Sequence, residues 1–231
     1  MIFTDDWGYI HVPRTAGSVV EYAMEEVWRD SSKITGLYDE QHTTVFDFQE
    51  LYNLNKYPSF LFGFVRNPYT YEWSIWNYHS YSWGIFQSFD EWCGFRFDGK
   101  KNEVYEKYAN NQDELDYAYI LFTRDMAGYF CDGSHKCVTN QIYRFEELEK
   151  SWEDIHSKVN TGIYFDIKES KTSEKYKFDY TDYSYNLVKS HRAKDLELFG
   201  YDFDGYTGDI PWDILAYAGM SRVPGYPRTI Q

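Results

Sequence analysis

The length, composition and charge of the chain limit what it can be. With 231 residues, 43% of them hydrophobic, it can bury one substantial core, and we expect a single domain over residues 1–231. A formal net charge of −14 argues against a nucleic acid or an anionic membrane as the main partner. The sequence holds no run of 18 apolar residues and no leader pattern, so we expect a soluble, cytoplasmic protein.

The first predicted unit is a strand, a turn and a helix. Residues 9–12 are typical of a short buried strand, and the turn PRTAGS follows at 13–18. From Val19 onward apolar residues recur at helical spacing, with acidic residues on the opposite face. This pattern predicts a helix that begins directly after the turn.

A second unit of the same kind begins at Phe60. The apolar run FLFGFV at 60–65 predicts a buried strand, and it ends at Arg66. Asn67 and Pro68 then mark a helix start, because Asn is a good N-cap and Pro is tolerated at the first helical position. A strand followed by a helix, repeated, predicts an α/β fold with a parallel sheet.

The remaining segments give weaker signals. Residues 80–118 are rich in aromatic and charged residues; FDGKKNEVY and NNQDELD within them indicate loops between short helices, and we expect this segment to elaborate an acceptor site. A strand is expected at 141–145, a helix at 146–159, a helix from Thr181 that Gly200 ends, and a C-terminal tail at 204–231.

The cysteines and the aromatic residues each leave two interpretations open. Three cysteines suit a reducing compartment, and CDGSHKC at 131–137 fits a hairpin turn at Asp132-Gly133 better than a zinc site, because it lacks a second ligand pair. Aromatic residues make up 21% of the chain. They serve either as bulky core residues or, in part, as platforms for sugar rings.

Two predicted strand ends carry groups that bind anions. The PRTAGS turn places backbone N–H groups and hydroxyls at a helix N-terminus, where partial positive charge favours a phosphate or sulfate. It is not a Walker A loop, because the G-x-x-x-x-G-K-[ST] pattern is absent. Arg66 ends the second strand, with Ser74 eight residues later. In a parallel sheet both ends open onto one crevice, which suits a ligand with two separated phosphates.

These segments resemble the carbohydrate-type sulfotransferase family. HVPRTAGS is similar to the family's 5′-phosphosulfate loop, and FGFVRNPYTYEWS is similar to its 3′-phosphate motif. YRFEELEKSWEDI and YTDYSYNLVKSHRAKDLELFGYDF also resemble family segments, so the similarity runs from about residue 9 to residue 203 in the right order. The acidic chain without an anchor differs from the Golgi members, which favours a microbial or viral source.

The resemblance implies a fold, a donor and a set of contacts. The fold is a three-layer α/β/α arrangement with a central parallel sheet, like P-loop nucleotide kinases. The donor is 3′-phosphoadenosine 5′-phosphosulfate (PAPS), with 3′,5′-bisphosphoadenosine (PAP) as product and no required metal. The residues implied to bind the 5′-phosphosulfate are Arg14, Thr15, Ala16, Gly17 and Ser18, those for the 3′-phosphate are Arg66 and Ser74, and a closing loop is expected at Lys171, Thr172 and Ser173.

The resemblance also implies a general base and a hydroxyl acceptor that is a carbohydrate. His42 lies near the place where relatives keep a catalytic histidine, and a group with a near-neutral pKa suits removal of the acceptor proton. His11, directly before the loop, is the alternative base.

Three departures from the family pattern keep other functions open. Arg14 replaces the loop lysine, Val19 replaces a hydroxyl residue, and Tyr71 replaces a basic residue. Arg14 and Tyr71 favour the second hypothesis, a catalytically silent PAP- or glycan-binding module. The third, a phosphoryl-transfer enzyme, would need a Walker lysine and a magnesium-binding acid that the sequence does not show.

Overall fold

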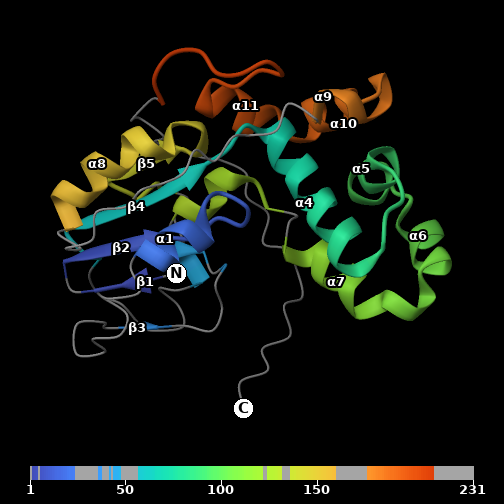
Figure 1. Cartoon of the computed structure of the whole chain (residues 1–231), viewed down its shortest axis with the longest axis horizontal. Helices are drawn as coiled ribbons and strands as arrows, with labels where there is room; N and C mark the ends of the chain where they lie inside the picture. Colours follow the sequence, from blue (N-terminus) through green and yellow to red (C-terminus); the bar gives the residue numbers. More distant parts are fainter. Residues whose placement is uncertain are drawn as a thin grey trace.

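A five-stranded sheet forms the centre of the protein. The computed structural model describes residues 2–4, 6–23, 36–37, 42, 44–47, 57–121, 124–131, 136–159 and 176–210. The strands are β1 (Ile2–Phe3), β2 (Trp7–Ile10), β3 (Gly36–Leu37), β4 (Phe60–Val65) and β5 (Gln141–Arg144), in the order β3-β1-β2-β4-β5. Neighbours β2, β4 and β5 are parallel, whereas β1 and β3 add antiparallel pairs at one edge (Figure 1). The fold is therefore mixed α/β with a small parallel core.

The three parallel strands confirm the strands predicted near residues 9, 60 and 141, with β2 beginning two residues earlier than expected. The antiparallel strands β1 and β3 were not predicted. Each has only two residues, which is too short to show a periodic pattern.

Each face of the sheet is covered by its own set of apolar side chains. In the parallel strands successive side chains point to opposite faces. Tyr9, Phe62 and Tyr143 belong to a core that includes residues of helices α1 (Gly17–Ala23) and α8 (Leu148–Val159). Ile10 and Leu61, from the alternate positions, belong to a larger core built with the remaining helices. Helices thus pack on both sides, with α8 along one face in Figure 1.

Helix α4 (Pro68–Trp83) begins as the sequence predicts. The Asn67 side chain accepts a hydrogen bond from the Tyr69 backbone N–H at 3.0 Å, and Pro68 occupies the first turn. Gly84, in the left-handed conformation, ends the helix. The strand β4 therefore passes into α4 within two residues, which places Arg66 at the junction.

The segment 80–118 is more helical than predicted. The stretches FDGKKNEVY and NNQDELD, expected as loops, largely form α6 (Lys101–Lys107) and α7 (Gln112–Leu121), and α5 (Phe89–Phe97) precedes them. The loop prediction was wrong because these helices are mostly polar and bury few residues, Val104 and Leu115 among them. Their apolar stripe is too narrow to stand out in the sequence.

Two helices replace the single helix predicted from Thr181. Thr181 caps α10 (Asp182–His191), and α11 (Ala193–Phe199) follows after a break at Arg192. Gly200, with φ 66°, ends α11 as predicted. A short helix, α9 (Tyr176–Asp179), precedes them.

In the 131–137 segment the backbones of Cys131 and Cys137 form an isolated antiparallel β-bridge, which agrees with the predicted hairpin.

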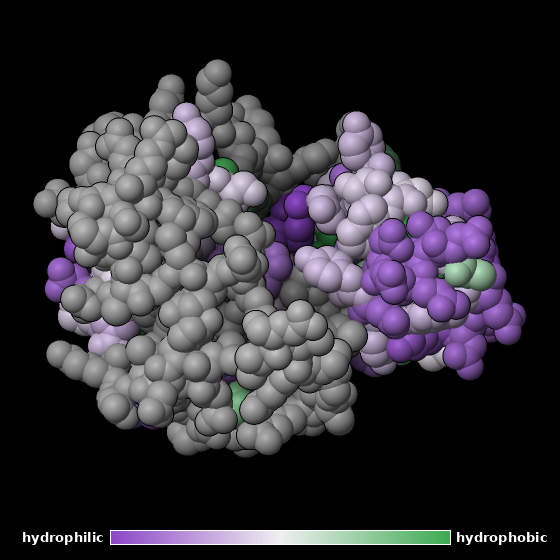
Figure 2. All heavy atoms as spheres, turned by 90° about the horizontal axis from the view of Figure 1, so that it is seen from below, coloured by the Kyte–Doolittle hydropathy of each residue, from purple (hydrophilic) through white to green (hydrophobic). Residues whose placement is uncertain are grey.

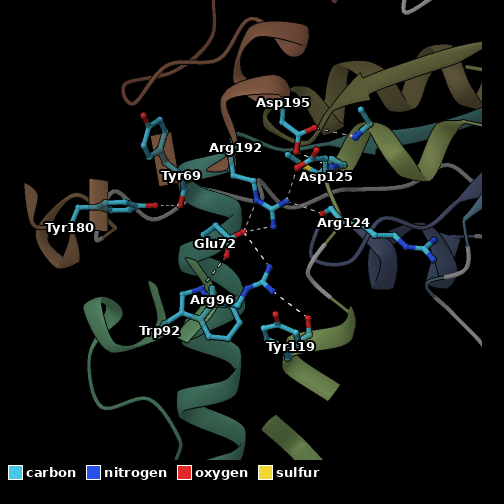
Figure 3. Close-up of polar contacts among 12 residues, drawn as sticks. Tyr69, Glu72, Trp92, Arg96, Tyr119, Arg124, Asp125, Tyr180, Arg192 and Asp195 are labelled. Atoms are coloured by element: carbon cyan, nitrogen blue, oxygen red, sulfur yellow. Dashed lines mark hydrogen bonds and ion pairs between the residues drawn. The ribbon is translucent and has the colours of Figure 1, made fainter. Parts of the chain in front are cut away.

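A buried ionic cluster fixes α4 against the later helices (Figure 3). Glu72 of α4 is fully buried and accepts hydrogen bonds from Arg192 at 2.8 and 2.5 Å and from the Trp92 indole at 3.1 Å. Arg96 of α5 lies 3.9 Å from the same carboxylate, and Arg192 also contacts Asp125 at 3.3 Å. Because buried charges need partners, this cluster specifies how the α10–α11 junction sits on α4. Arg192 stands at the break between those two helices.

Within the residues that the structure describes, none of the helices is long and apolar enough to cross a bilayer.

Candidate functional site

The loop after β2 has a backbone shape suited to anions. Arg14 and Ala16 both adopt left-handed conformations, with φ of 59° and 77°. The buried hydroxyl of Thr15 donates to the Val12 carbonyl at 2.8 Å and closes the turn. Turns of this kind direct successive N–H groups toward one concave side, the geometry of an anion-binding nest. Non-glycine residues in this conformation store strain, which is a feature of functional loops.

Arg66, at the end of the neighbouring strand, is linked to this loop. Its buried guanidinium donates to the Arg14 carbonyl at 3.2 Å and to the Thr70 hydroxyl at 3.0 Å. The guanidinium also lies over the Phe145 ring, 4.5 Å from the centroid. Burial lowers the pKa of Arg66 to about 10, opposed by Glu146, so the group stays charged at neutral pH. A buried, positively charged guanidinium at the end of β4 thus contacts the loop that follows β2.

Arg14 and Ser74 bring the two sequence motifs into direct contact. The Arg14 Nε donates to the Ser74 hydroxyl at 3.2 Å, across 60 positions of sequence. Its guanidinium also lies 5.0 Å from the centre of the Tyr78 ring. The charge of Arg14 further lowers the pKa of Arg66, because like charges disfavour one another. An anion bound between them would relieve this repulsion.

Residues that the sequence did not single out fix the position of the Arg66 motif. The Asn67 backbone N–H donates to Glu146 at 2.9 Å, and the other carboxylate oxygen accepts from the Tyr201 hydroxyl at 2.7 Å. The Asn67 amide also donates to the carbonyls of Asp202 and Gly205, at 2.7 and 3.2 Å. The turn after α11 is therefore hydrogen-bonded to the start of α4 and holds it in position. The only sequence signal for this was the resemblance of YRFEEL and GYDF to family segments.

His42 and His11 lie together beside the loop. Their ring centroids are 4.5 Å apart in an edge-on arrangement, and His11 stacks on Tyr9 at 5.7 Å. The Nε2 of His11 would lie 1.5 Å from a Cβ placed on Gly17, so the ring of His11 fills the space above the first residue of α1. Both candidate bases thus lie beside the Arg14 loop, next to the first residue of α1.

The environment of His42 keeps it neutral. Burial, followed by the neighbouring His11, lowers the pKa of His42 to about 3, while a hydrogen bond with the His11 backbone opposes the shift. The Nδ1 atom is buried and has no hydrogen-bond partner among the described residues. The near-neutral pKa that we expected is therefore wrong for the ligand-free protein. The neutral imidazole, the form that accepts a proton, is present throughout the physiological range.

Other predicted site residues are placed differently or lie outside the described part. Gly17 begins α1 and Ser18 is exposed in its first turn. Lys171, Thr172 and Ser173 fall outside the described residues. Within the described residues the side chains of His, Cys, Asp and Glu form no group of three suited to a metal ion.

Comparison of the chain with models of protein families, with curated proteins and with solved structures found no match.

Proposed function

We propose that the protein is a sulfotransferase that moves a sulfuryl group from PAPS to a hydroxyl of a carbohydrate acceptor. The observation that carries the proposal is the hydrogen bond between Arg14 and Ser74. It joins the two segments that resemble the 5′-phosphosulfate loop and the 3′-phosphate motif of the carbohydrate-type sulfotransferases. A donor with phosphates at both ends of its nucleoside needs the two motifs close together.

The proposal includes the finer architecture of that family, a three-layer α/β/α fold like the P-loop nucleotide kinases. Its support is the parallel β2-β4-β5 core with helices on both faces, and a loop followed by a helix after β2. The antiparallel strands β1 and β3 are additions at one edge of this arrangement. Ligands of open α/β sheets bind outside the carboxyl ends of the strands, where Arg14 and Arg66 lie.

The described residues fit a nucleotide that carries two separate anionic groups. The nest at Arg14–Ala16 offers backbone N–H groups, and Arg66 and Ser74 offer a guanidinium and a hydroxyl near the neighbouring strand end. PAPS supplies the sulfuryl group. Arg14 and the loop N–H groups stabilise the negative charge that develops on the departing phosphate oxygen. Because these groups supply positive charge, the proposed reaction does not depend on a metal ion.

His42 is proposed to accept the proton of the acceptor hydroxyl. As the new O–S bond forms and the bond between sulfur and the bridging phosphate oxygen breaks, the hydroxyl proton moves to the imidazole, and PAP departs. A pKa of about 3 makes the ligand-free imidazole a weak base. An anionic donor bound beside it would raise that pKa, because a nearby negative charge favours the protonated form. His11 is the alternative base, 4.5 Å away between ring centroids.

One observation favours a second candidate, a silent PAP- or glycan-binding module. Tyr71 stands where the resembled motif has a basic residue, and it is fully buried in the core. That position therefore contributes no cation to the nucleotide. A module of this kind would bind PAP without transferring sulfate.

A transfer assay with PAPS radiolabelled at sulfur tests the proposal. The full chain is incubated with neutral oligosaccharides, a steroid and a tyrosine peptide as acceptors, with and without a chelator. We expect labelled oligosaccharide, formed equally in both conditions. If the protein binds PAP but labels none of the acceptors, the silent binding module is the correct hypothesis and the sulfotransferase is not. Transfer that the chelator abolishes and magnesium restores would contradict the metal-independent mechanism.

A further inference from the structure

A row of aromatic side chains leads away from Arg14 along α4. Tyr78 lies under the Arg14 guanidinium, and its ring centroid is 5.9 Å from that of Trp83. Trp83 in turn lies 5.8 Å from Tyr117 of α7. Tyr81, one turn beyond Tyr78, is 92% exposed, and Tyr78 and Tyr117 are also exposed. We call Tyr78, Tyr81, Trp83 and Tyr117 the aromatic row.

The row stands in an uncharged part of an acidic protein. From Trp73 to Phe89 the chain has no Asp, Glu, Lys or Arg, although 26% of all residues are charged. The exposed polar residues of α4 next to these rings in the sequence are Asn77 and Ser82, which are both uncharged. In Figure 2 pale, weakly polar residues gather between the centre of the molecule and the strongly hydrophilic right-hand end, toward which α6 lies in Figure 1.

We infer that the aromatic row is the acceptor-binding surface, and that the acceptor is an uncharged sugar chain. This inference rests on the proposed function and specifies its substrate class. Aromatic faces bind the apolar face of a sugar ring, while Asn77 and Ser82 bind its hydroxyl groups. Tyr81 stands on open surface instead of in an enclosed cavity, which suits an extended chain better than a compact steroid or phenol.

Charge decides between neutral and charged acceptors. Among the described residues Arg14 is the cation that contacts the row, through Tyr78, and α7 presents exposed Asp113 and Asp116 beside Tyr117. An anionic glycan would be repelled by these aspartates and by the net charge of −14. A cationic ligand would be repelled by Arg14 at the end of the row that meets the proposed transfer site. An uncharged sugar chain avoids both of these repulsions.

Binding of defined hexasaccharides to the PAP-saturated protein tests the inference. Calorimetry compares neutral cellohexaose, hexa-N-acetylchitohexaose and maltohexaose with anionic hexagalacturonate and a heparin hexasaccharide. We expect at least one neutral chain to bind more tightly than either anionic chain. Tyr78→Ala and Tyr81→Ala should each weaken that binding about tenfold, the order expected for loss of one stacked ring. Phe178→Ala is the matched control, because Phe178 of α9 is an equally exposed aromatic residue at 88%.

Four outcomes overturn the inference. The first two are that no neutral sugar chain binds, or that an anionic chain binds more tightly than every neutral one. The third is that Tyr81→Ala and Phe178→Ala weaken sugar binding equally. The fourth is that the protein sediments as a dimer, which Tyr81→Ala converts to monomers. A PAP-induced rise in melting temperature without sugar binding would reject the aromatic row alone. Sugar binding through the row without any PAP effect would instead reject the proposed function.

Discussion

The imidazole of His11 occupies the space in which a side chain at Gly17 would lie. Its Nε2 is 1.5 Å from the position of a Cβ on that glycine. The ring has little room to move, because it contacts Tyr9 on one side and His42 on the other. The start of α1, the Arg14 loop and the two histidines therefore form one tightly packed unit.

Replacing Gly17 with Ala should destabilise the protein by about 1–3 kcal/mol, because the added methyl group forces His11 to shift in a closely packed site. Gly205→Ala is the matched control, since nothing lies within 4 Å of a Cβ at Gly205 and its φ is not in the left-handed range. Urea unfolding of both variants measures the difference. Equal stabilities would show that His11 moves away without cost.

PAP should stabilise the fold far more than AMP does, because Arg66 and Ser74 are proposed to bind the additional 3′-phosphate. At one hundred times its dissociation constant PAP should contribute about 2.7 kcal/mol, visible as a higher melting temperature. Ser74→Ala should reduce the PAP effect more than the AMP effect, since it removes a 3′-phosphate contact and touches the 5′-phosphate only through the lost hydrogen bond to Arg14. If PAP and AMP raise the melting temperature equally in the native protein, the 3′-phosphate assignment is wrong.

His42→Ala should leave PAP binding nearly unchanged and reduce sulfate transfer by about 10²- to 10⁴-fold, the usual contribution of a general base. His11→Ala made in parallel distinguishes the two histidines. Because the pKa of His42 is lowered to about 3, kcat/KM, which reports the free enzyme, should not rise through a histidine-like pKa near neutrality. Such a rise in the native enzyme that disappears in His42→Ala would contradict the neutral state described above.

The half-buried His42 and the fully buried His79 should make the fold sensitive to acid. Burial lowers the pKa of both His42 and His79 from 6.5 to about 3. Between these values the unfolded chain binds more protons than the folded one, so the stability present above the unfolded pKa is lost as pH falls toward the folded pKa. Each histidine should then cost about 1.4 kcal/mol per pH unit.

Urea unfolding across this pH range measures that loss. The variant His79→Phe, which keeps a buried aromatic ring, should show a shallower dependence on pH. His156→Phe, at a half-exposed position of α8, serves as the control for loss of a histidine ring. Parallel curves for the native protein and His79→Phe would show that His79 is not buried in its neutral form.

Glu72→Gln should destabilise the protein by about 3–5 kcal/mol, because it removes the buried carboxylate that pairs with the charges of Arg192 and Arg96. Lys150→Gln breaks the Lys150–Glu147 pair, in which Lys150 is 81% exposed, and should change stability by at most about 1 kcal/mol. Chemical denaturation compares the two variants. A loss in Glu72→Gln as small as that in Lys150→Gln would mean that the cluster does not anchor α4.

The sequence by itself determined the features that depend on a few neighbouring residues. The apolar run at 60–65, the Asn67 cap with Pro68, and Gly200 at the end of α11 are all local, because a strand pattern or a cap needs only adjacent positions. The placement of Arg14 in the loop after β2, and of Arg66 directly after β4, followed from the same signals. The helical nature of α6 and α7 did not, since their apolar stripe is narrow.

Only the tertiary structure decided which distant residues meet. The contact between Arg14 and Ser74, the position of His42 against His11, and the ionic cluster of Glu72 join segments far apart in the chain. The sequence showed a histidine suited to proton transfer, but its pKa depends on burial by residues brought in from elsewhere. Local patterns specify elements, whereas pKa values, ion pairs and sites depend on packing between elements, which no single segment encodes.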